Sequence, residues 1–196
     1  MTINGFLRLA LQTVTAPREV AQLLLALNLP RQALWLAFML VIVLNTLMFS
    51  VSLLFSPSDD LIGPLLGSPS VFGTMLAASV AALIFAVTVC GRPLGGTASF
   101  EQIAILLIWI QALRVLMQAV LIVLGPVSLL LSGVVVSAAS VVGIWILVNF
   151  IDVAHEIGSL LKSGLVLLLA VVGMMLGLSV IFSLLGVQTG GIPGYV

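Results

Sequence analysis

The chain has 196 residues, of which 62% are hydrophobic and only 6% are charged, and its mean hydropathy is +1.41. A soluble domain carries roughly 25% charged residues because its surface faces water, so a water-soluble globule is excluded. Six basic and six acidic residues cancel, which removes any electrostatic argument for nucleic acid as a partner. Cys90 is the single cysteine, which excludes an intramolecular disulfide and a cysteine-based metal site. We therefore expect an all-α, multi-pass integral membrane protein with one domain over residues 1–196.

The N-terminal region, residues 1–31, precedes any run long enough to span a bilayer. Only Arg8 stands before its short, interrupted apolar stretch, which differs from a cleaved signal peptide, so residue 1 is expected in the mature chain. Pro17 suits the first turn of a helix. From Val20 on, apolar residues follow at i, i+3, i+4 and i+7, which predicts an amphipathic helix. This cytoplasmic amphipathic segment either packs on the bundle and anchors the first span, or senses the membrane or docks a partner.

Five later runs are long and apolar enough to span a bilayer, which takes about 20 residues. They are separated by segments rich in Gly, Pro and Ser, which favour turns. Because Gly125-Pro126 is so short, the third and fourth spans should form a tight antiparallel hairpin. The expected spans are about 33–55, 71–90, 103–124, 127–150 and 164–186.

The basic residues around the spans all predict one orientation. Alternate connections carry Lys or Arg. In the connections on the other side, the only charged residues are the acidic Asp59 and Asp60. Cytoplasmic connections are enriched in Lys and Arg. The N-terminus is therefore expected in the cytoplasm and the C-terminus outside. The basic residues on the cytoplasmic side are Arg8, Arg18, Arg31, Arg92 and Lys162.

Three segments resemble the Ypt-interacting (Yip) family of five-span membrane proteins, in its bacterial form. They are TAPREVAQLLLALNLPRQALWLAFMLV, GRPLGGTASFEQIAILLIW and NFIDVAHEIGSLLKSGLVLLLAVV. The resemblance implies five helices, a cytoplasmic N-terminus and no known catalytic residues. It also implies a bacterial cytoplasmic (inner) membrane, with a periplasmic C-terminus. Eukaryotic members are linked to Rab-type GTPases and vesicle traffic. They have a long cytoplasmic N-terminal region that this chain does not show, so GTPase binding is not expected here.

Small residues recur at four-residue spacing on three spans, which lets helix backbones approach closely in a membrane. Two interpretations stay open: packing inside the bundle, or a homodimer contact through Gly173 and Gly177. The positions are Gly73, Ala77 and Ala81 on the second span, Gly133/Ser137 and Ala139/Gly143 on the fourth, and Gly173/Gly177 on the fifth.

A polar cluster is expected at the cytoplasmic face. Asp152, His155 and Glu156 stand at i, i+3 and i+4, so a continued helix would present them on one side. A metal site needs ligands from a second element, and only Glu101 is near, so neither a metal nor a cofactor is expected. The cluster is more simply the water-facing end of the fourth span. Arg92 lies in the glycine-rich turn GRPLGG, which either contacts lipid phosphate or only makes the turn.

Arg114 is the most unusual residue inside a span. It lies eleven residues after Ile103, about 16 Å along a helix and so close to the bilayer centre. An arginine at that depth costs at least about 2.5–3.5 kcal/mol. Gln111 and Gln118 stand at i−3 and i+4, on the same side of the helix.

The partner of Arg114 cannot be a carboxylate from a span interior of this chain, because none contains Asp or Glu. Asn45, Ser137 and Ser140 are also central in their spans. We therefore hypothesise a polar layer at mid-bilayer that includes Arg114, Gln111, Gln118 and Asn45. This layer could fix helix register, meet the carboxylate of a partner protein, or line a path for a substrate or lipid headgroup.

Neither a Ser/His/Asp or Cys/His set nor a phosphate-binding loop is present in the sequence, so we do not expect an enzyme. The favoured function is a membrane-organising or accessory (scaffold) subunit, whose partners are the lipid bilayer and either other membrane proteins or further copies of the chain. The alternative is a small transporter or channel with a path past Arg114. A transporter should have a water-accessible cavity that reaches Arg114, whereas an organiser should form a closed bundle.

Overall fold

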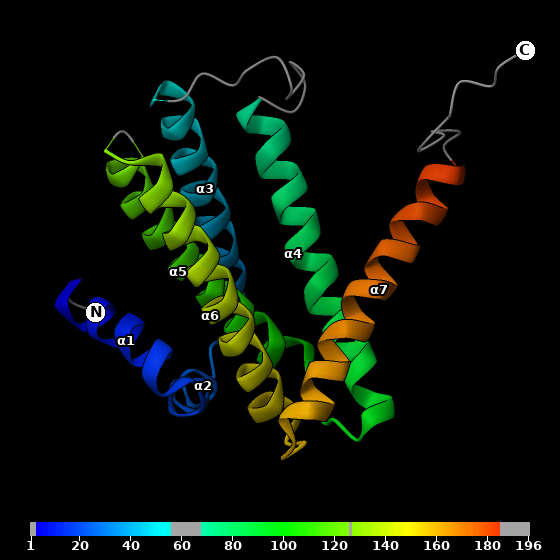
Figure 1. The fold of residues 1–196 in the computed structure, drawn as a ribbon. Coiled ribbons are helices and arrows are strands. Elements are labelled where there is room, and N and C mark those ends of the chain that lie inside the picture. The colour runs from blue at the N-terminus through cyan, green and yellow to red at the C-terminus, as the bar shows by residue number, and fades with distance from the viewer. Residues whose placement is uncertain (1–2, 56–67, 126, 185–196) are drawn as a thin grey trace, which may run out of the picture.

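The computed structural model describes residues 3–55, 68–125 and 127–184, and every regular element within them is helical (Figure 1). Five of these helices, α3 to α7, are long and apolar enough to cross a membrane, which confirms the predicted all-α, five-span fold class. In chain order the elements are α1 (Ile3–Thr15), α2 (Pro17–Ala26), α3 (Arg31–Phe55), α4 (Pro69–Gly91), η1 (Arg92–Leu94), α5 (Phe100–Leu124), α6 (Leu129–His155) and α7 (Leu160–Leu184).

Several helices begin or end outside the expected span limits. α5 begins at Phe100 rather than 103 because Ser99 and Gln102 form a capping box, with N···O distances of 3.2 and 2.8 Å. α6 continues to His155 instead of ending at 150, and α7 already starts at Leu160. These extra turns contain polar residues such as Glu101, Asp152 and Lys162, so a criterion based on apolar length alone misses them.

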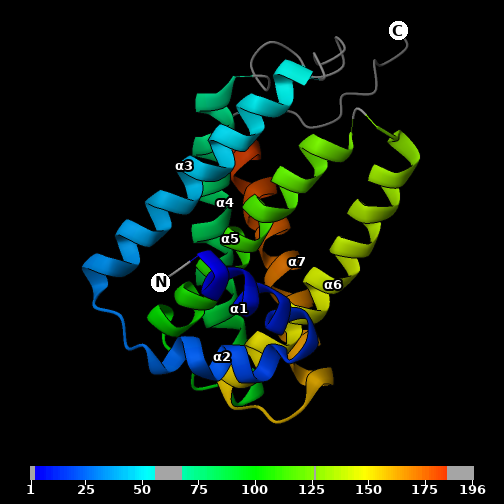
Figure 2. The same ribbon diagram turned by 90° about the vertical axis from the view of Figure 1, so that its left-hand side faces the viewer.

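The two ends of the bundle carry different residues. α1, α2, the connection between α4 and α5 and the connection between α6 and α7 lie at one end (Figures 1 and 2). We call it the basic end, because Arg18, Arg31, Arg92 and Lys162 belong to it. The other end, which we call the far end, is where α3, α5 and α7 finish and where α4 and α6 begin.

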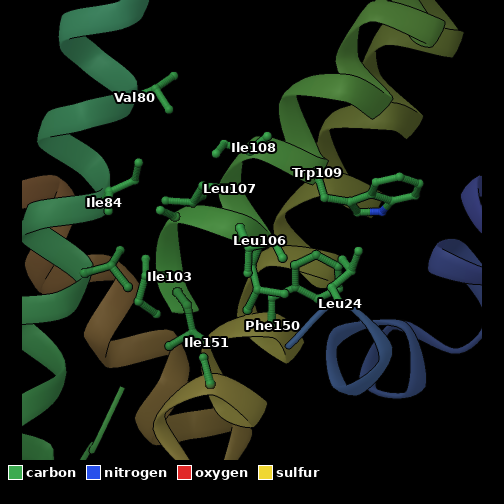
Figure 3. Close-up of a cluster of buried hydrophobic side chains, with 14 of the residues drawn as sticks. Leu24, Val80, Ile84, Ile103, Leu106, Leu107, Ile108, Trp109, Phe150 and Ile151 are labelled. Carbon is green, nitrogen blue, oxygen red and sulfur yellow. The ribbon is translucent and has the colours of Figure 1, made fainter. Parts of the chain in front are cut away.

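The hydrophobic core lies in the half of the bundle next to the basic end. Every residue of Ile103–Trp109 on α5 is buried, so this part of the helix is enclosed on all sides. α5 contacts α2, α3, α4 and α6. Figure 3 shows Leu24 of α2 and Phe150 and Ile151 of α6 around this stretch. The most central helix is therefore the one that carries Arg114.

The far half of the bundle is much more open. On α7, every residue of Val171–Val180 except Met174 is exposed, and Figure 1 shows α7 leaning away from α3, α5 and α6. α6 is similarly exposed at Leu130 and Val134, at 82% and 60%. Because these side chains are apolar, lipid or another protein must cover them in a membrane.

The prediction of small-residue packing inside the bundle is correct on one span and wrong on two. At Gly73 of α4, an added Cβ would lie 2.7 Å from the Thr46 hydroxyl of α3, so the two helices do approach closely there. An added Cβ on α6 or α7 would meet no other atom within 4 Å at Gly133, Gly143, Gly173 or Gly177. No described residue of a neighbouring helix packs against those glycines.

The N-terminal segment forms two helices instead of the single expected one. On α2, Val20, Ala21 and Leu24 are buried against the bundle, whereas Leu23 and Leu27 are 53% and 59% exposed. The predicted apolar stripe is therefore divided between the bundle and the surroundings. The helix α1 was not expected, because polar residues interrupt its apolar stretch.

A buried polar contact holds α1 against α5. The indole Nε1 of Trp109 donates to the Thr13 hydroxyl at 3.0 Å, and the Thr13 side chain is fully buried. Phe6 packs edge-on against the same indole, with ring centroids 5.3 Å apart. Trp109 thus anchors both ends of α1 to the most central helix.

Candidate functional site

The carboxylate of Asp152 organises the basic end. Its Oδ2 accepts from the Arg18 guanidinium at 2.7 Å, which joins α6 to α2. Its Oδ1 accepts from the Ser159 backbone N–H at 2.9 Å and from the Ser163 hydroxyl at 3.1 Å. Arg18 also donates through Nε to the Asn149 side chain at 3.2 Å. Asp152 is only 5% exposed, so these donors replace its hydration.

A cavity of about 530 Å³ opens beside this ion pair, between α2, the start of α5 and the end of α6. Its lining combines two carboxylates, one guanidinium and two amides with apolar side chains. The polar and glycine residues are Arg18, Gln22, Gln102, Asp152, Glu156 and Gly158. The cavity has the volume of a small ligand or of a few side chains of a partner.

Glu156 is the acidic residue of the cavity that remains unpaired among the described residues. It terminates α6 in the left-handed conformation, with φ of 55°. Its side chain is exposed and, within the described part of the chain, makes no hydrogen bond or ion pair. The prediction of a water-facing cluster is therefore correct for Glu156 and wrong for Asp152 and His155. These two are buried because α2 and the connection between α4 and α5 cover the extended end of α6.

His155 is fully buried against the glycine-rich turn. Its Nδ1 accepts from the Ala98 backbone N–H at 3.4 Å, and its carbonyl accepts from Thr97 at 3.3 Å. A Cβ at Gly91 or Gly96 would overlap the imidazole ring. The imidazole thus fills the turn, and its close approach explains two of the glycines in GRPLGG. The third, Gly95, has φ of 90°.

Arg92 does not join the other predicted members of the cluster. It lies in η1 with an exposed side chain and is not among the residues that line the cavity. Glu101 is the acidic residue that the sequence analysis places near this cluster. It pairs with Arg31 at 2.8 Å, which links the start of α3 to the start of α5.

The residues of the predicted mid-bilayer layer are only partly brought together. Asn45 is fully buried and donates to the Val41 carbonyl at 2.7 Å and to the Gln111 carbonyl at 3.2 Å, so it joins α3 to α5. Arg114 is exposed and forms no hydrogen bond or ion pair with the described residues. Gln118 lies one turn further along α5, and its Oε1 is buried without a hydrogen-bond donor.

The hydroxyls considered as partners of Arg114 are engaged elsewhere. Ser137 and Ser140 are exposed on α6 and donate to the carbonyls of Gly133 and Val136, at 2.9 and 2.8 Å. Both hydroxyls donate to the backbone of their own helix, so they do not contribute to the polar layer around Arg114 as expected.

The described residues contain no group of three His, Cys, Asp or Glu side chains placed to hold a metal ion. The residues lining the cavity provide no hydroxyl, thiol or imidazole nucleophile. This arrangement can recognise a charged or hydrogen-bonding group, and in particular a cation beside Glu156.

Sequence reasoning missed the part of the site that comes from α2. In the sequence, Arg18 indicates only the orientation of the chain, and no pattern distinguishes Gln22. Asn149 stands three residues before Asp152, so its place on the same side of α6 could have been found from helical spacing. The partner of Asp152 on α2 could not, since it requires knowing where α2 docks.

A scan against protein-family models matches the Yip1 domain over residues 11–181. Searches of curated proteins and of solved structures found no significant match. The family match includes α2 and the five spanning helices, and hence both elements joined by Arg18 and Asp152. The chain therefore belongs to the Yip1-domain family.

Proposed function

We propose that this Yip1-domain protein is a non-enzymatic accessory subunit of the bacterial cytoplasmic membrane that holds other membrane proteins by their basic cytoplasmic margins. One observation carries the proposal: the cavity at the basic end places the unpaired carboxylate of Glu156 beside the neutralised Arg18–Asp152 pair.

The sidedness of the bundle supports this proposal. Arg18, Arg31, Arg92 and Lys162 all belong to the end that contains the cavity, and residues 56–68 contain no Lys or Arg. Basic residues concentrate on cytoplasmic connections. The cavity then opens to the cytoplasm, with the N-terminus on the same side and the C-terminus in the periplasm.

The charge of the cavity indicates what it binds. Arg18 and Asp152 compensate each other at 2.7 Å, so Glu156 leaves the lining with a net negative charge. The same positive-inside rule gives most membrane proteins Lys or Arg residues at their cytoplasmic margins. A basic juxtamembrane segment is therefore the complementary partner. A single exposed ion pair stabilises by about 0.2–1 kcal/mol, so the Gln22 and Gln102 amides must add hydrogen bonds.

The test is photo-crosslinking in native membranes from a photo-reactive residue in place of Gln22. We expect an adduct with a membrane protein, mapped to a segment that contains Lys or Arg next to a spanning helix. Glu156→Gln should reduce the adduct at least about threefold, which corresponds to about 0.65 kcal/mol. Glu19→Gln is the matched control, because Glu19 is acidic and on α2 but does not line the cavity. A partner segment without basic residues, or an adduct unaffected by Glu156→Gln, would contradict the proposal.

A further inference from the structure

The inner side of α5 changes character halfway along the membrane. Gln111 and Gln118 stand three residues before and four residues after Arg114, on the same side of α5, and they are buried and half-buried. Val123, nine residues after Arg114 or about two and a half turns, is on the opposite side and is 70% exposed. Arg114 therefore projects toward the bundle interior, yet it is exposed. The interior next to it is open.

α7 shows a similar change along its length. Val166 and Ala170 are fully buried, and Gly173 and Gly177 follow each of them by seven residues, on the same side. A Cβ at either glycine would meet no atom within 4 Å. Figure 1 shows this part of α7 leaning away from α5. The inward sides of both helices are thus without a partner in the far half.

Three polar or glycine positions lie in the middle turns of their helices. Asn45 and Arg114 each lie fourteen residues after the start of a helix that begins at the basic end, about 21 Å along its axis. Gly173 lies thirteen residues after the start of α7, about 20 Å along it. The guanidinium is therefore near the membrane centre, beside an open space.

Three amide oxygens on α3 and α5 are buried near the middle of these helices. Asn45 is fully buried and Gln111 is 9% exposed, and neither the Oδ1 nor the Oε1 has a hydrogen-bond donor among the described residues. The Oε1 of Gln118 is also buried and has no hydrogen-bond donor among the described residues. Arg114 forms no hydrogen bond with these oxygens among the described residues, and an unpaired guanidinium at mid-bilayer depth is costly unless another molecule supplies its acceptor.

A phospholipid headgroup does not fit this position. Arg114 lies about 21 Å from Phe100 and, ten residues before Leu124, about 15 Å from the far end of α5. Side chains on a helix lean toward its N-terminus, so Arg114 leans away from the nearer surface. Snorkelling serves residues close to helix ends, not at this depth.

A second copy of the chain does not supply the counter-charge either. Its six acidic residues lie before a span, between spans or within four residues of a span end. They are Glu19, Asp59, Asp60, Glu101, Asp152 and Glu156.

We propose that the inward sides of α5 and α7 in the far half receive a transmembrane helix of a different membrane protein, whose Asp or Glu at mid-bilayer depth pairs with Arg114. Gly173 and Gly177 let that helix approach α7 closely. The carboxylate of that helix accepts from the guanidinium donors of Arg114. This inference rests on the proposed accessory role and adds an intramembrane contact to it.

The test places a photo-reactive phenylalanine analogue at position 177, where the structure leaves room, and at position 123 as the lipid-facing control. Crosslinking is carried out in native membranes. From position 177 we expect an adduct with a protein that has an Asp or Glu in the middle of a spanning segment, and from position 123 only lipid adducts. Arg114→Leu should reduce the protein adduct at least about tenfold, whereas Arg114→Lys should retain it within about threefold.

A charge exchange between Arg114 and the partner distinguishes loss of the contact from loss of folding. Arg114→Glu should abolish the adduct, and an Asp or Glu to Arg change in the partner should restore it. Adducts with lipid alone, with a second copy, or with a protein lacking an intramembrane acid would overturn the inference, as would an adduct unchanged by Arg114→Leu. A protein adduct from position 22 that persists while position 177 gives none would leave the cytoplasmic site intact and remove only this inference.

Discussion

The guanidinium of Arg18 donates to the carboxylate of Asp152 at 2.7 Å, although the two residues are 134 positions apart in the chain. This contact ties α2 to the end of α6 and forms one wall of the cavity at the basic end. The position of a helix outside the five spans thus determines the shape of the candidate site.

Loss of the Asp152 carboxylate should destabilise the basic end more than loss of its partner. Asp152→Ala removes the acceptor of three hydrogen bonds, so we expect a decrease of about 2–4 kcal/mol in unfolding free energy. Arg18→Ala leaves Asp152 bonded to Ser159 and Ser163, and the arginine side chain is 52% exposed, so about 0.5–1.5 kcal/mol is expected. Denaturation in detergent micelles measures both, and equal effects would show that Arg18 is the main donor.

Gly91→Ala should destabilise the turn between α4 and α5, because the new methyl group would overlap the His155 imidazole. Overpacking of this kind costs about 1–3 kcal/mol. In the double variant with His155→Ala, the combined loss should be smaller than the sum of the single losses, since the clash has gone. Thermal unfolding of the four proteins completes the cycle.

Gly143→Ala is the matched control for this cycle. Gly143 lies in α6 with open space around its Cβ position. The substitution should be neutral or stabilise by up to about 1 kcal/mol through helix propensity. If Gly91→Ala behaved in the same way, the close approach of His155 to Gly91 would be refuted.

Thr13→Val should loosen α1 while leaving the spans in place. The change keeps the shape but removes the acceptor for the Trp109 indole N–H, which is buried, at a cost of about 1–3 kcal/mol. Thr13→Ser retains the hydroxyl and should behave nearly as the unmodified protein. Hydrogen exchange should become faster in α1 for Thr13→Val alone; unchanged protection would mean that the hydrogen bond does not hold the helix.

The orientation can be tested with reporter fusions at Thr97 and Ser58. Thr97 belongs to the basic end, next to the turn that carries Arg92, so its fusion should be cytoplasmic. Ser58 lies in the connection between the first two spans, which has no Lys or Arg, so its fusion should be periplasmic. The reverse result at both positions would place the cavity outside the cell.

Properties that depend on composition along one helix could be predicted from the sequence. The five spans follow from apolar length, and the position of Asn45 and Gln111 in the middle part of their spans follows from counting residues along each helix. The Arg18–Asp152 pair could not be predicted, because it depends on where a short helix docks. The burial of His155 likewise depends on the turn that packs over it.

The open far half is the feature least accessible to sequence reasoning. Small residues at four-residue spacing predict close contact, and this is correct at Gly73 but not at Gly173 or Gly177. The same pattern serves contacts within a bundle and contacts with another molecule. Only the separation of α7 from α5 distinguishes the two cases, and it is a property of the assembled fold.

The most direct test of the central claim is the affinity of a synthetic lysine-rich juxtamembrane peptide for the protein in nanodiscs. Zwitterionic lipid is used so that the bilayer itself does not attract the peptide. Each exposed ion pair contributes about 0.2–1 kcal/mol, so replacing attraction by repulsion in Glu156→Lys should weaken binding about three- to tenfold. Added salt should weaken binding to the unmodified protein as well. Equal affinity for the unmodified protein and for Glu156→Lys would contradict the assignment of the cavity to basic segments of partner proteins.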